Sequence, residues 1–231
     1  MSQVDDTFRY ERKFLVQNRP HQVVEAVVRR HPAIFRKAYP DREVNNIYFD
    51  SADYQSLRDN IEGVTNRTKT RIRWYGDVRG SAANPKLEFK IKRGIVGTKE
   101  THSLASIDTA DGRIRHNVVD QLRRSTLPER VGLHMAMIQP SLLNSYWRKY
   151  FVSADGRFRI TIDRDLRYYR PKNPWTRRPE LQRGATVLEL KYARADDVAA
   201  SAIAQALGFR LTRNSKYVTG MSLLYGVVDY Y

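Results

Sequence analysis

The chain has 231 residues, and its 41 lysines and arginines outnumber 25 aspartates and glutamates, giving a formal net charge of +16. It contains no cysteine, which excludes disulfides and thiolate metal sites. No apolar run approaches the roughly 20 residues of a membrane-spanning helix, and no signal-peptide pattern opens the sequence, so we expect a cytoplasmic protein. This length predicts a single domain, residues 1–231, and the basic charge indicates a polyanionic partner.

The first part of the chain predicts strands that alternate with short helices. Alternating polar and apolar residues indicate strands, helical spacing of valines indicates a helix, and proline and glycine mark where helices end. The predicted elements are a strand from Arg9 to Val16, a helix from Pro20 to Pro32, a strand from Asn45 to Asp50, and a short helix capped by Ser51 or Asp53 and stopped by Gly63.

Two basic strands follow, at residues 69–75 and 86–92, joined by a turn-forming loop. Successive side chains of an extended strand point to opposite faces. In both segments lysines and arginines therefore share one face, while apolar residues such as Ile72 and Phe89 share the other. One such strand is typical of a sheet with a solvated charged face. The pattern recurs in several strands with carboxylates among the cations, which favours a basic pore suited to a metal-bound polyphosphate.

The second half of the chain is irregular at first and then strand-rich. Residues 94–140 predict little beyond a helix near Val118 to Arg124. The remaining predictions are a hairpin of Ser145–Val152 and Arg157–Asp165 around an Asp155-Gly156 turn, a mobile loop from Tyr168 to Gly184, a strand from Val187 to Tyr192, a helix capped by Asp196 and ending before Gly208, and a last helix near Ser215.

A series of motifs resembles the VTC domain, the polyphosphate polymerase domain of the triphosphate tunnel metalloenzyme superfamily. The motifs occur in the family's order over nearly the whole chain: Arg9-Tyr10-Glu11-Arg12-Lys13-Phe14, Ile47-Tyr48-Phe49-Asp50, Lys69-Thr70-Arg71-Ile72-Arg73-Trp74-Tyr75, Leu87-Glu88-Phe89-Lys90, Tyr146-Trp147-Arg148-Lys149-Tyr150, Arg159-Ile160-Thr161-Ile162-Asp163, Leu188-Glu189-Leu190-Lys191-Tyr192 and Ser215-Lys216-Tyr217. The resemblance implies an α+β fold, in which a closed antiparallel eight-stranded β-barrel forms a tunnel with flanking helices. It also implies a divalent metal held by glutamate.

The first strand distinguishes branches of this superfamily. The thiamine triphosphatase and adenylate cyclase branch begins with Glu-x-Glu-x-Lys, whereas the corresponding residues here are Arg9, Glu11 and Lys13. Arginine in place of the first acid removes a metal ligand and adds a phosphate donor. This substitution favours the polymerase-type pattern that the resemblance implies.

Phosphoryl transfer requires positioning and neutralisation of charge on the phosphate oxygens, which basic side chains and a divalent cation supply. Oxygen ligands suit Mn²⁺ or Mg²⁺. The candidate catalytic residues are Lys13, Arg71, Arg73, Lys90, Arg148 and Lys216. The candidate substrate-binding residues are Arg9, Lys69, Lys92, Arg159, Lys191 and Ser215. The candidate metal ligands are Glu189, with Glu11 or Glu88 assisting.

Structural roles compete with several of these assignments. Glu88, which lies next to Lys86 and Lys90 in the sequence, is equally a cross-strand salt-bridge partner, and Ser215 is more typical of a helix N-cap than of a nucleophile. Asp163 and Asp165 are open as metal ligands. The five histidines lack ligand spacing and are predicted at the surface or in loops, and four aromatic residues are predicted to pack under outer helices: Trp74, Trp147, Phe151 and Phe158.

Three functions remain open at this point. The first is a polymerase that transfers the γ-phosphate of ATP, or of another triphosphate, to polyphosphate. The second is a metal-dependent tripolyphosphatase or nucleoside triphosphatase, and the third is a non-catalytic binder of polyphosphate or nucleic acid. Carboxylates within a basic lining weaken anion binding unless a metal occupies them, so they favour an enzyme and make nucleic acid the less expected partner.

Overall fold

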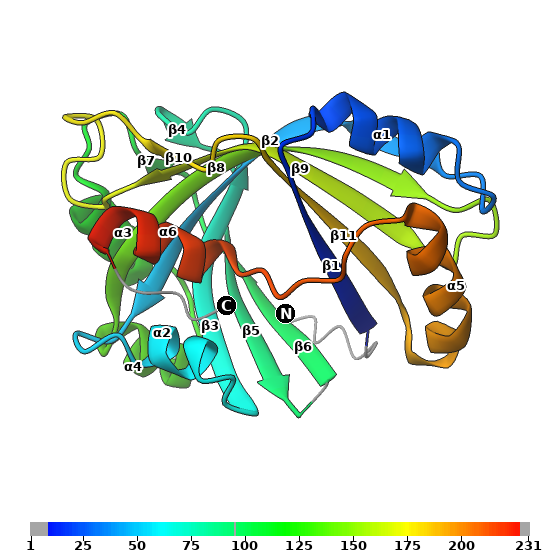
Figure 1. Ribbon diagram of the computed structural model, residues 1–231. Coiled ribbons are helices and arrows are strands. Elements are labelled where there is room, and N and C mark those ends of the chain that lie inside the picture. The colour runs from blue at the N-terminus through cyan, green and yellow to red at the C-terminus, as the bar shows by residue number, and fades with distance from the viewer. Residues whose placement is uncertain (1–8, 95, 227–231) are drawn as a thin grey trace.

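The computed structural model describes residues 9–94 and 96–226. Its main feature is one antiparallel sheet that curls so that its two halves face a common interior (Figure 1). Alternating side chains place one row of residues in this interior and the other row under the outer helices. In hydrogen-bonded order the strands are β1 (Arg9–Gln17), β11 (Ala185–Ala193), β9 (Arg159–Tyr169), β8 (Gln139–Val152), β2 (Arg36–Asp50), β3 (Asn66–Tyr75), β5 (Lys86–Arg93) and β6 (Val96–Ser103).

The expected closed barrel is wrong, because the strand order ends at β1 and β6 without a hydrogen-bonded ladder between them in the described residues. Other groups occupy part of the free edge of β1. Thr212 donates its backbone N–H to the carbonyl of Lys13 (2.8 Å), and its hydroxyl accepts the N–H of Leu15 (2.9 Å). The two halves nevertheless approach closely, since Lys90 of β5 lies 3.3 Å from a carboxylate oxygen of Glu11 in β1.

A ninth strand corrects the expected number of eight. This strand, β10 (Glu180–Leu181), pairs with β9 outside the main order, while β4 (Ser81–Ala82) and β7 (Ile107–Asp108) form a separate two-stranded sheet. β10 lies in the segment predicted as a mobile loop. That segment is also anchored by Trp175, whose indole N–H donates to the carbonyl of Thr109 (2.7 Å) and whose ring packs edge-on against Tyr169.

Helices cover the outer side of both halves of the sheet (Figure 1). α1 (His21–Arg29) and α5 (Asp197–Leu207), which follows a short 3-10 turn (Arg194–Asp196), pack on β1, β9 and β11. α3 (Ile114–Arg124) and α4 (Glu129–Ala136) pack on β2, β3 and β5. The predicted packing of Trp74, Phe151 and Phe158 under these helices is confirmed. Trp147 instead lies against the Arg164 guanidinium.

The last helix closes one end of the interior. α6 (Lys216–Tyr225) packs with α2 (Gln55–Ile61) on an apolar cluster built from β2, β8, β9 and β11. Gly220 permits this close approach, because a Cβ atom there would lie 2.6 Å from the ring of Tyr168 and 2.7 Å from Leu142. The N-terminus of α6 is thereby fixed at the interior of the sheet.

Two local predictions differ from the structure. The irregular stretch 94–140 contains β6 and α4, which sequence patterns did not reveal. Tyr54, not Ser51 or Asp53, is the residue that precedes α2, and its side chain caps no helix N–H. The Ser51 hydroxyl accepts the N–H of Gln55, and the carboxylate of Asp50 accepts those of Ser56 and Leu57. Among the described residues no helix has the length and apolar character needed to cross a membrane.

Candidate functional site

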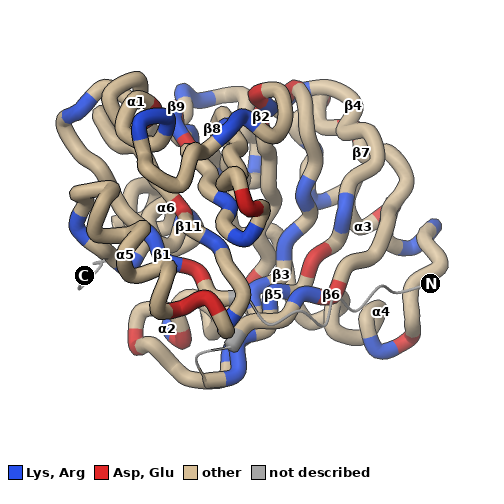
Figure 2. Tube along the Cα trace, turned by 90° about the vertical axis from the view of Figure 1, so that its right-hand side faces the viewer, with Lys and Arg blue, Asp and Glu red and all other residues tan. Residues whose placement is uncertain are grey.

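Charged residues gather on the inner face of the sheet. Figure 2 shows lysines, arginines and acidic residues recurring along β1, β11, β3, β5 and β6. On β3 the basic residues Lys69, Arg71 and Arg73 alternate with Ile72 and Trp74, which are buried under the outer helices. The sequence alternation therefore separates a charged lining from a hydrophobic core, as predicted.

Asp163 of β9 is the most deeply buried acid of the lining, with 0% of its surface exposed. Arg148 of β8 binds it with two hydrogen bonds, of 2.5 and 2.7 Å. Lys216, the first residue of α6, lies 2.6 Å from the same carboxylate. A carboxylate whose role the sequence left open thus holds two predicted phosphate-binding cations in place.

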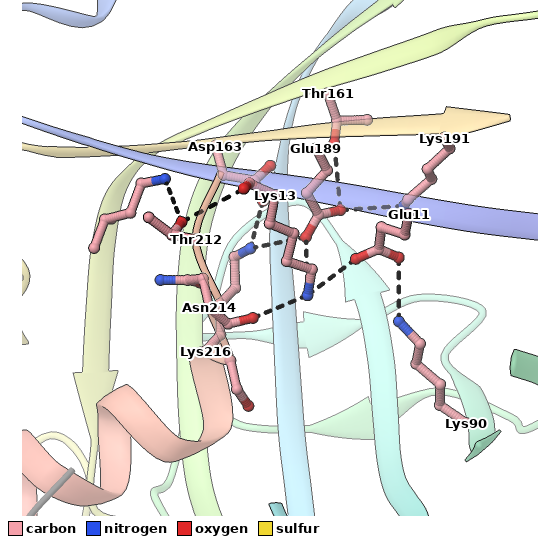
Figure 3. Close-up of polar contacts among 12 residues, drawn as sticks. Glu11, Lys13, Lys90, Thr161, Asp163, Glu189, Lys191, Thr212, Asn214 and Lys216 are labelled. Carbon is pink, nitrogen blue, oxygen red and sulfur yellow. Dashed lines mark hydrogen bonds and ion pairs between the residues drawn. The ribbon is translucent and has the colours of Figure 1, made fainter. Parts of the chain in front are cut away.

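Glu189 of β11 lies beside this group and contacts four cations, of which Lys13, Lys191 and Lys216 are labelled in Figure 3. Its oxygens lie 3.1 Å from Lys191, 3.4 Å from Arg148, 3.6 Å from Lys216 and 3.8 Å from Lys13. This side chain is 8% exposed. Burial within so many cations gives Glu189 the most connected position among the predicted metal ligands.

Glu11 approaches the same point from β1. Lys13 lies 2.9 Å from one of its oxygens and Lys90 lies 3.3 Å from the other. The Lys13 ammonium also donates to the carbonyl of Asn214 (3.0 Å). Lys13 is therefore shared by Glu11 and Glu189 just before the N-terminus of α6 (Figure 3).

Glu88 forms a separate group on β5. Arg71 contacts one of its oxygens through Nε (2.8 Å) and Nη2 (2.7 Å), and Arg73 lies 3.8 Å from the same oxygen. Lys99 lies 3.2 Å from the other oxygen. This is the salt-bridge role considered as the alternative for Glu88. Lys99 was missed because the polar sequence of β6 gave no strand signal.

Lys69 differs from the other lining cations because it contacts a hydroxyl. Its ammonium lies 2.9 Å from Oγ of Ser215, and no carboxylate forms an ion pair with it in the part of the chain that the structure describes. Ser215 is the N-cap of α6, since its Oγ accepts the N–H of Val218. The N-cap prediction is confirmed, and the helix N-terminus adds positive potential at this point.

Ionisation follows from these contacts. Burial disfavours the charged form of Glu11, Glu88, Asp163 and Glu189, but the neighbouring cations outweigh burial and lower the pKa of each. Their attraction likewise outweighs burial at Lys13, Arg71, Arg148 and Lys216 and raises the pKa of each. Burial, together with repulsion by Lys13 and Lys90, lowers the pKa of Lys69 well below its usual value.

Lys90 has a pKa closer to neutral pH than that of an ordinary lysine. Attraction to Glu11 raises its pKa, but partial desolvation of the ammonium and the repulsion of Lys13 and Lys191 outweigh that attraction, and the pKa is lowered to about 8. The side chain is 47% exposed. The charge of Lys90 therefore changes within the pH range of ordinary assays.

The remaining predicted substrate residues lie at the border of the lining. Lys92 is half-buried on β5, and burial followed by repulsion from Arg67 and Arg213 lowers its pKa. Arg159 is exposed and lies opposite Lys191 in the β9–β11 ladder. Arg9 begins β1, and its side chain lies outside the described part of the structure.

The prediction that all five histidines lie at the surface or in loops is wrong for His102, and His31 lies in a loop, as predicted, but is buried. His31 is buried, and its ring nitrogens contact the carbonyl of Ile203 and the N–H of Ala33. His102 is buried on the outer side of β6 and lies 2.7 Å from Glu100. Neither histidine faces the charged lining, so both have packing roles.

The carboxylates fit a divalent cation only in part. Glu11 and Glu189 converge on the Lys13 ammonium and are ionised, so two hard oxygen donors meet at one place. Over residues 9–94 and 96–226, no group of three or more acidic or histidine side chains is arranged to hold a metal. Substrate oxygens and water would have to complete the coordination, as they commonly do for Mg²⁺.

Comparison with known proteins gives one family and a shared fold. The model of the VTC domain matches residues 8–225, whereas no curated protein matches the chain significantly. A candidate adenylate cyclase of Vibrio parahaemolyticus superposes with a TM-score of 0.51 at 13% identity, over 92% of this chain and 98% of its own. A candidate adenylyl cyclase of Hippeastrum, reported to have a dominant triphosphatase activity, gives 0.52 at 16% identity, over 93% and 95%.

Proposed function

The chain belongs to the VTC domain family, and from this we propose that it is a polyphosphate polymerase. The proposed reaction transfers the γ-phosphate of ATP to the terminal phosphate of a growing chain and depends on a divalent metal. The observation that carries the proposal is the excess of cations on the inner face. Nine basic side chains surround four carboxylates there: Lys13, Lys69, Arg71, Arg73, Lys90, Lys99, Arg148, Lys191 and Lys216 against Glu11, Glu88, Asp163 and Glu189.

The arginines suit the equatorial oxygens of the transferred phosphoryl group, because their N–H groups are held in fixed directions. Asp163 orients Arg148 through Nε and Nη2, and Nη1 of Arg148 has no hydrogen bond to another described residue. Glu88 orients Arg71 in the same way. We therefore assign Glu88 to positioning Arg71 and not to the metal.

The acceptor needs no general base. Its terminal phosphate oxygen is already ionised at neutral pH and attacks the γ-phosphorus in line, while the bond from the γ-phosphorus to the β,γ-bridging oxygen breaks and ADP leaves. Lys13 and Lys216 lie where they can neutralise the phosphate oxygens. Glu189 and Glu11 would hold Mn²⁺ or Mg²⁺, which neutralises charge on the phosphates when bound.

A hydrolase is the second candidate. Lys90 is 47% exposed beside Glu11, so water reaches the edge of the carboxylate group and could replace phosphate as acceptor. The same cations would then serve a tripolyphosphatase or nucleoside triphosphatase. Binding of polyphosphate without turnover is the remaining alternative.

Incubation with ATP and either Mn²⁺ or Mg²⁺ tests these alternatives. Polymerisation yields a ladder of polyphosphate on a stained polyacrylamide gel with little free phosphate, and hydrolysis yields free phosphate alone. Glu189→Gln is expected to abolish the ladder. The control Glu180→Gln, an exposed acid on β10, is expected to retain it. If neither product forms with Mn²⁺ or with Mg²⁺, both the polymerase and the hydrolase are refuted.

A further inference from the structure

The inner face becomes aromatic beyond the proposed phosphate-binding arginines. On β3, Tyr75 follows Arg73 by two residues, and on β8, Tyr150 follows Arg148 by two residues. Residues two apart in a strand share a face and lie about 7 Å apart. Both tyrosines therefore lie one step beyond the arginines on the same face of the sheet.

Arg42 of β2 joins these rings into one group. It is the register partner of Arg148, and its guanidinium lies 5.3 Å from the ring centre of Tyr75, 5.3 Å from that of Tyr39 and 5.9 Å from that of Tyr150. The ring of Tyr39 packs edge-on against that of Tyr150, with 5.7 Å between the ring centres. Arg42 forms no ion pair with any carboxylate in the described residues. We call these four residues the tyrosine–arginine cluster.

Two rings of this cluster are open to solvent. Tyr39 is 56% exposed and Tyr75 is 47% exposed. By contrast, Tyr146, which precedes Arg148 by two residues on β8, is 1% exposed. The opposite end of the interior is filled by the apolar packing of α6 against β8 and β9. The tyrosine–arginine cluster therefore lies on the accessible side of the lining, where a ligand would extend out of it.

We propose that the tyrosine–arginine cluster binds the nucleobase of a nucleoside triphosphate whose phosphates lie on the inner arginines, which rests on the proposed function. Exposed aromatic rings stack on the flat faces of bases, and a guanidinium adds a cation–π contact. Stacking accepts every base. It is stronger for the larger ring system of purines, so ATP and GTP are expected to bind more tightly than CTP and UTP.

Equilibrium binding of ATP and of inorganic tripolyphosphate in metal-free buffer tests this inference. Stacking on one aromatic side chain contributes about 1–3 kcal/mol per base, so Tyr75→Ala is expected to weaken ATP binding by about 5-fold or more. Its affinity for tripolyphosphate should change by less than about 2-fold, because that ligand has no base. Tyr75→Phe keeps the ring and is expected to bind ATP nearly as the parent protein does.

Tyr225→Ala is the matched control. Tyr225 is the last residue of α6, and its ring also contacts an arginine, Arg170, but it lies outside the tyrosine–arginine cluster. Tyr225→Ala is expected to change neither affinity, and Tyr39→Ala should repeat the effect of Tyr75→Ala if the latter folds poorly. Equal weakening of ATP and tripolyphosphate, or no weakening of ATP, would overturn the nucleobase assignment alone. Failure of the parent protein to bind either ligand, both in metal-free buffer and with added Mn²⁺ or Mg²⁺, would refute the proposed function and this inference together.

Discussion

The ammonium of Lys216 lies 2.6 Å from the carboxylate of Asp163, which joins the first residue of the last helix to the middle of the sheet. Asp163 is fully buried and also binds Arg148 through two hydrogen bonds. One carboxylate thus fixes two cations that come from elements distant in sequence. The following predictions depend on this arrangement and on the neighbouring glutamates.

Asp163→Asn is expected to destabilise the fold strongly. The substitution leaves Arg148 and Lys216 buried without their main counter-charge, and removal of one partner of a buried ion pair costs about 3–5 kcal/mol. Urea unfolding measures this loss. The control Asp120→Asn removes the exposed partner of Arg124 on α3 and is expected to leave the unfolding midpoint unchanged. Similar midpoints for the two variants would contradict the structural role of Asp163.

Stability is expected to fall with acidification. The folded state lowers the pKa of Asp163 and Glu189 below the ordinary values of 3.8 and 4.5. Their contribution to stability is therefore fully present above the ordinary pKa values and is lost as pH falls through the lowered ones. The free energy of unfolding, measured by urea titration between neutral pH and about pH 3, should decrease less steeply for Asp163→Asn than for the parent protein. Parallel curves would show that Asp163 is not the source.

Triphosphate affinity is expected to fall as pH rises through about 8. The pKa of Lys90 is lowered to about 8, so this side chain is protonated below that pH and loses its positive charge above it. Lys90→Arg keeps the charge at every accessible pH and should remove this part of the decline. Tripolyphosphate affinity between about pH 6.5 and pH 9.5 measures the effect. Lys86→Arg, at the exposed start of the same strand, is the control, and an identical decline in all three proteins would contradict the assignment.

Glu189→Gln is expected to separate metal binding from anion binding. Loss of the carboxylate should weaken Mn²⁺ binding, measured by electron paramagnetic resonance, and lower kcat by about 100-fold or more. Tripolyphosphate binding in metal-free buffer should instead become tighter, because a negative charge leaves a cationic surface.

Glu88→Gln provides the comparison for Glu189→Gln. Since Glu88 contacts Arg71, Arg73 and Lys99, its loss should raise KM and leave Mn²⁺ binding in place. Unchanged Mn²⁺ binding in Glu189→Gln would refute the metal assignment.

The charged lining could be predicted from the sequence because strand alternation is a local property. Lys69, Arg71 and Arg73 share a face through spacing alone. The partners of these residues could not be predicted in the same way. The contacts of Lys69 with Ser215 and of Lys216 with Asp163 depend on the position of α6, which the packing of Gly220 determines.

The open edge of the sheet and the missed elements also have physical reasons. Thr212 occupies part of the edge of β1 through tertiary hydrogen bonds that no local pattern encodes. β6 consists largely of residues with low strand preference and is held by its ladder with β5. Recognising this strand would have placed Lys99 on the inner face. The Asp50 cap was missed because it lies several residues before the helix that it caps.

The source of the acceptor oxygen tests the central proposal most directly. The reaction of ATP with the metal-loaded protein in water enriched in ¹⁸O, followed by mass spectrometry of the products, distinguishes phosphate from water as the attacking group. The account predicts polyphosphate chains without ¹⁸O, formed together with ADP. Free phosphate carrying one ¹⁸O atom, without labelled or unlabelled chains, would contradict the polymerase and establish a hydrolase.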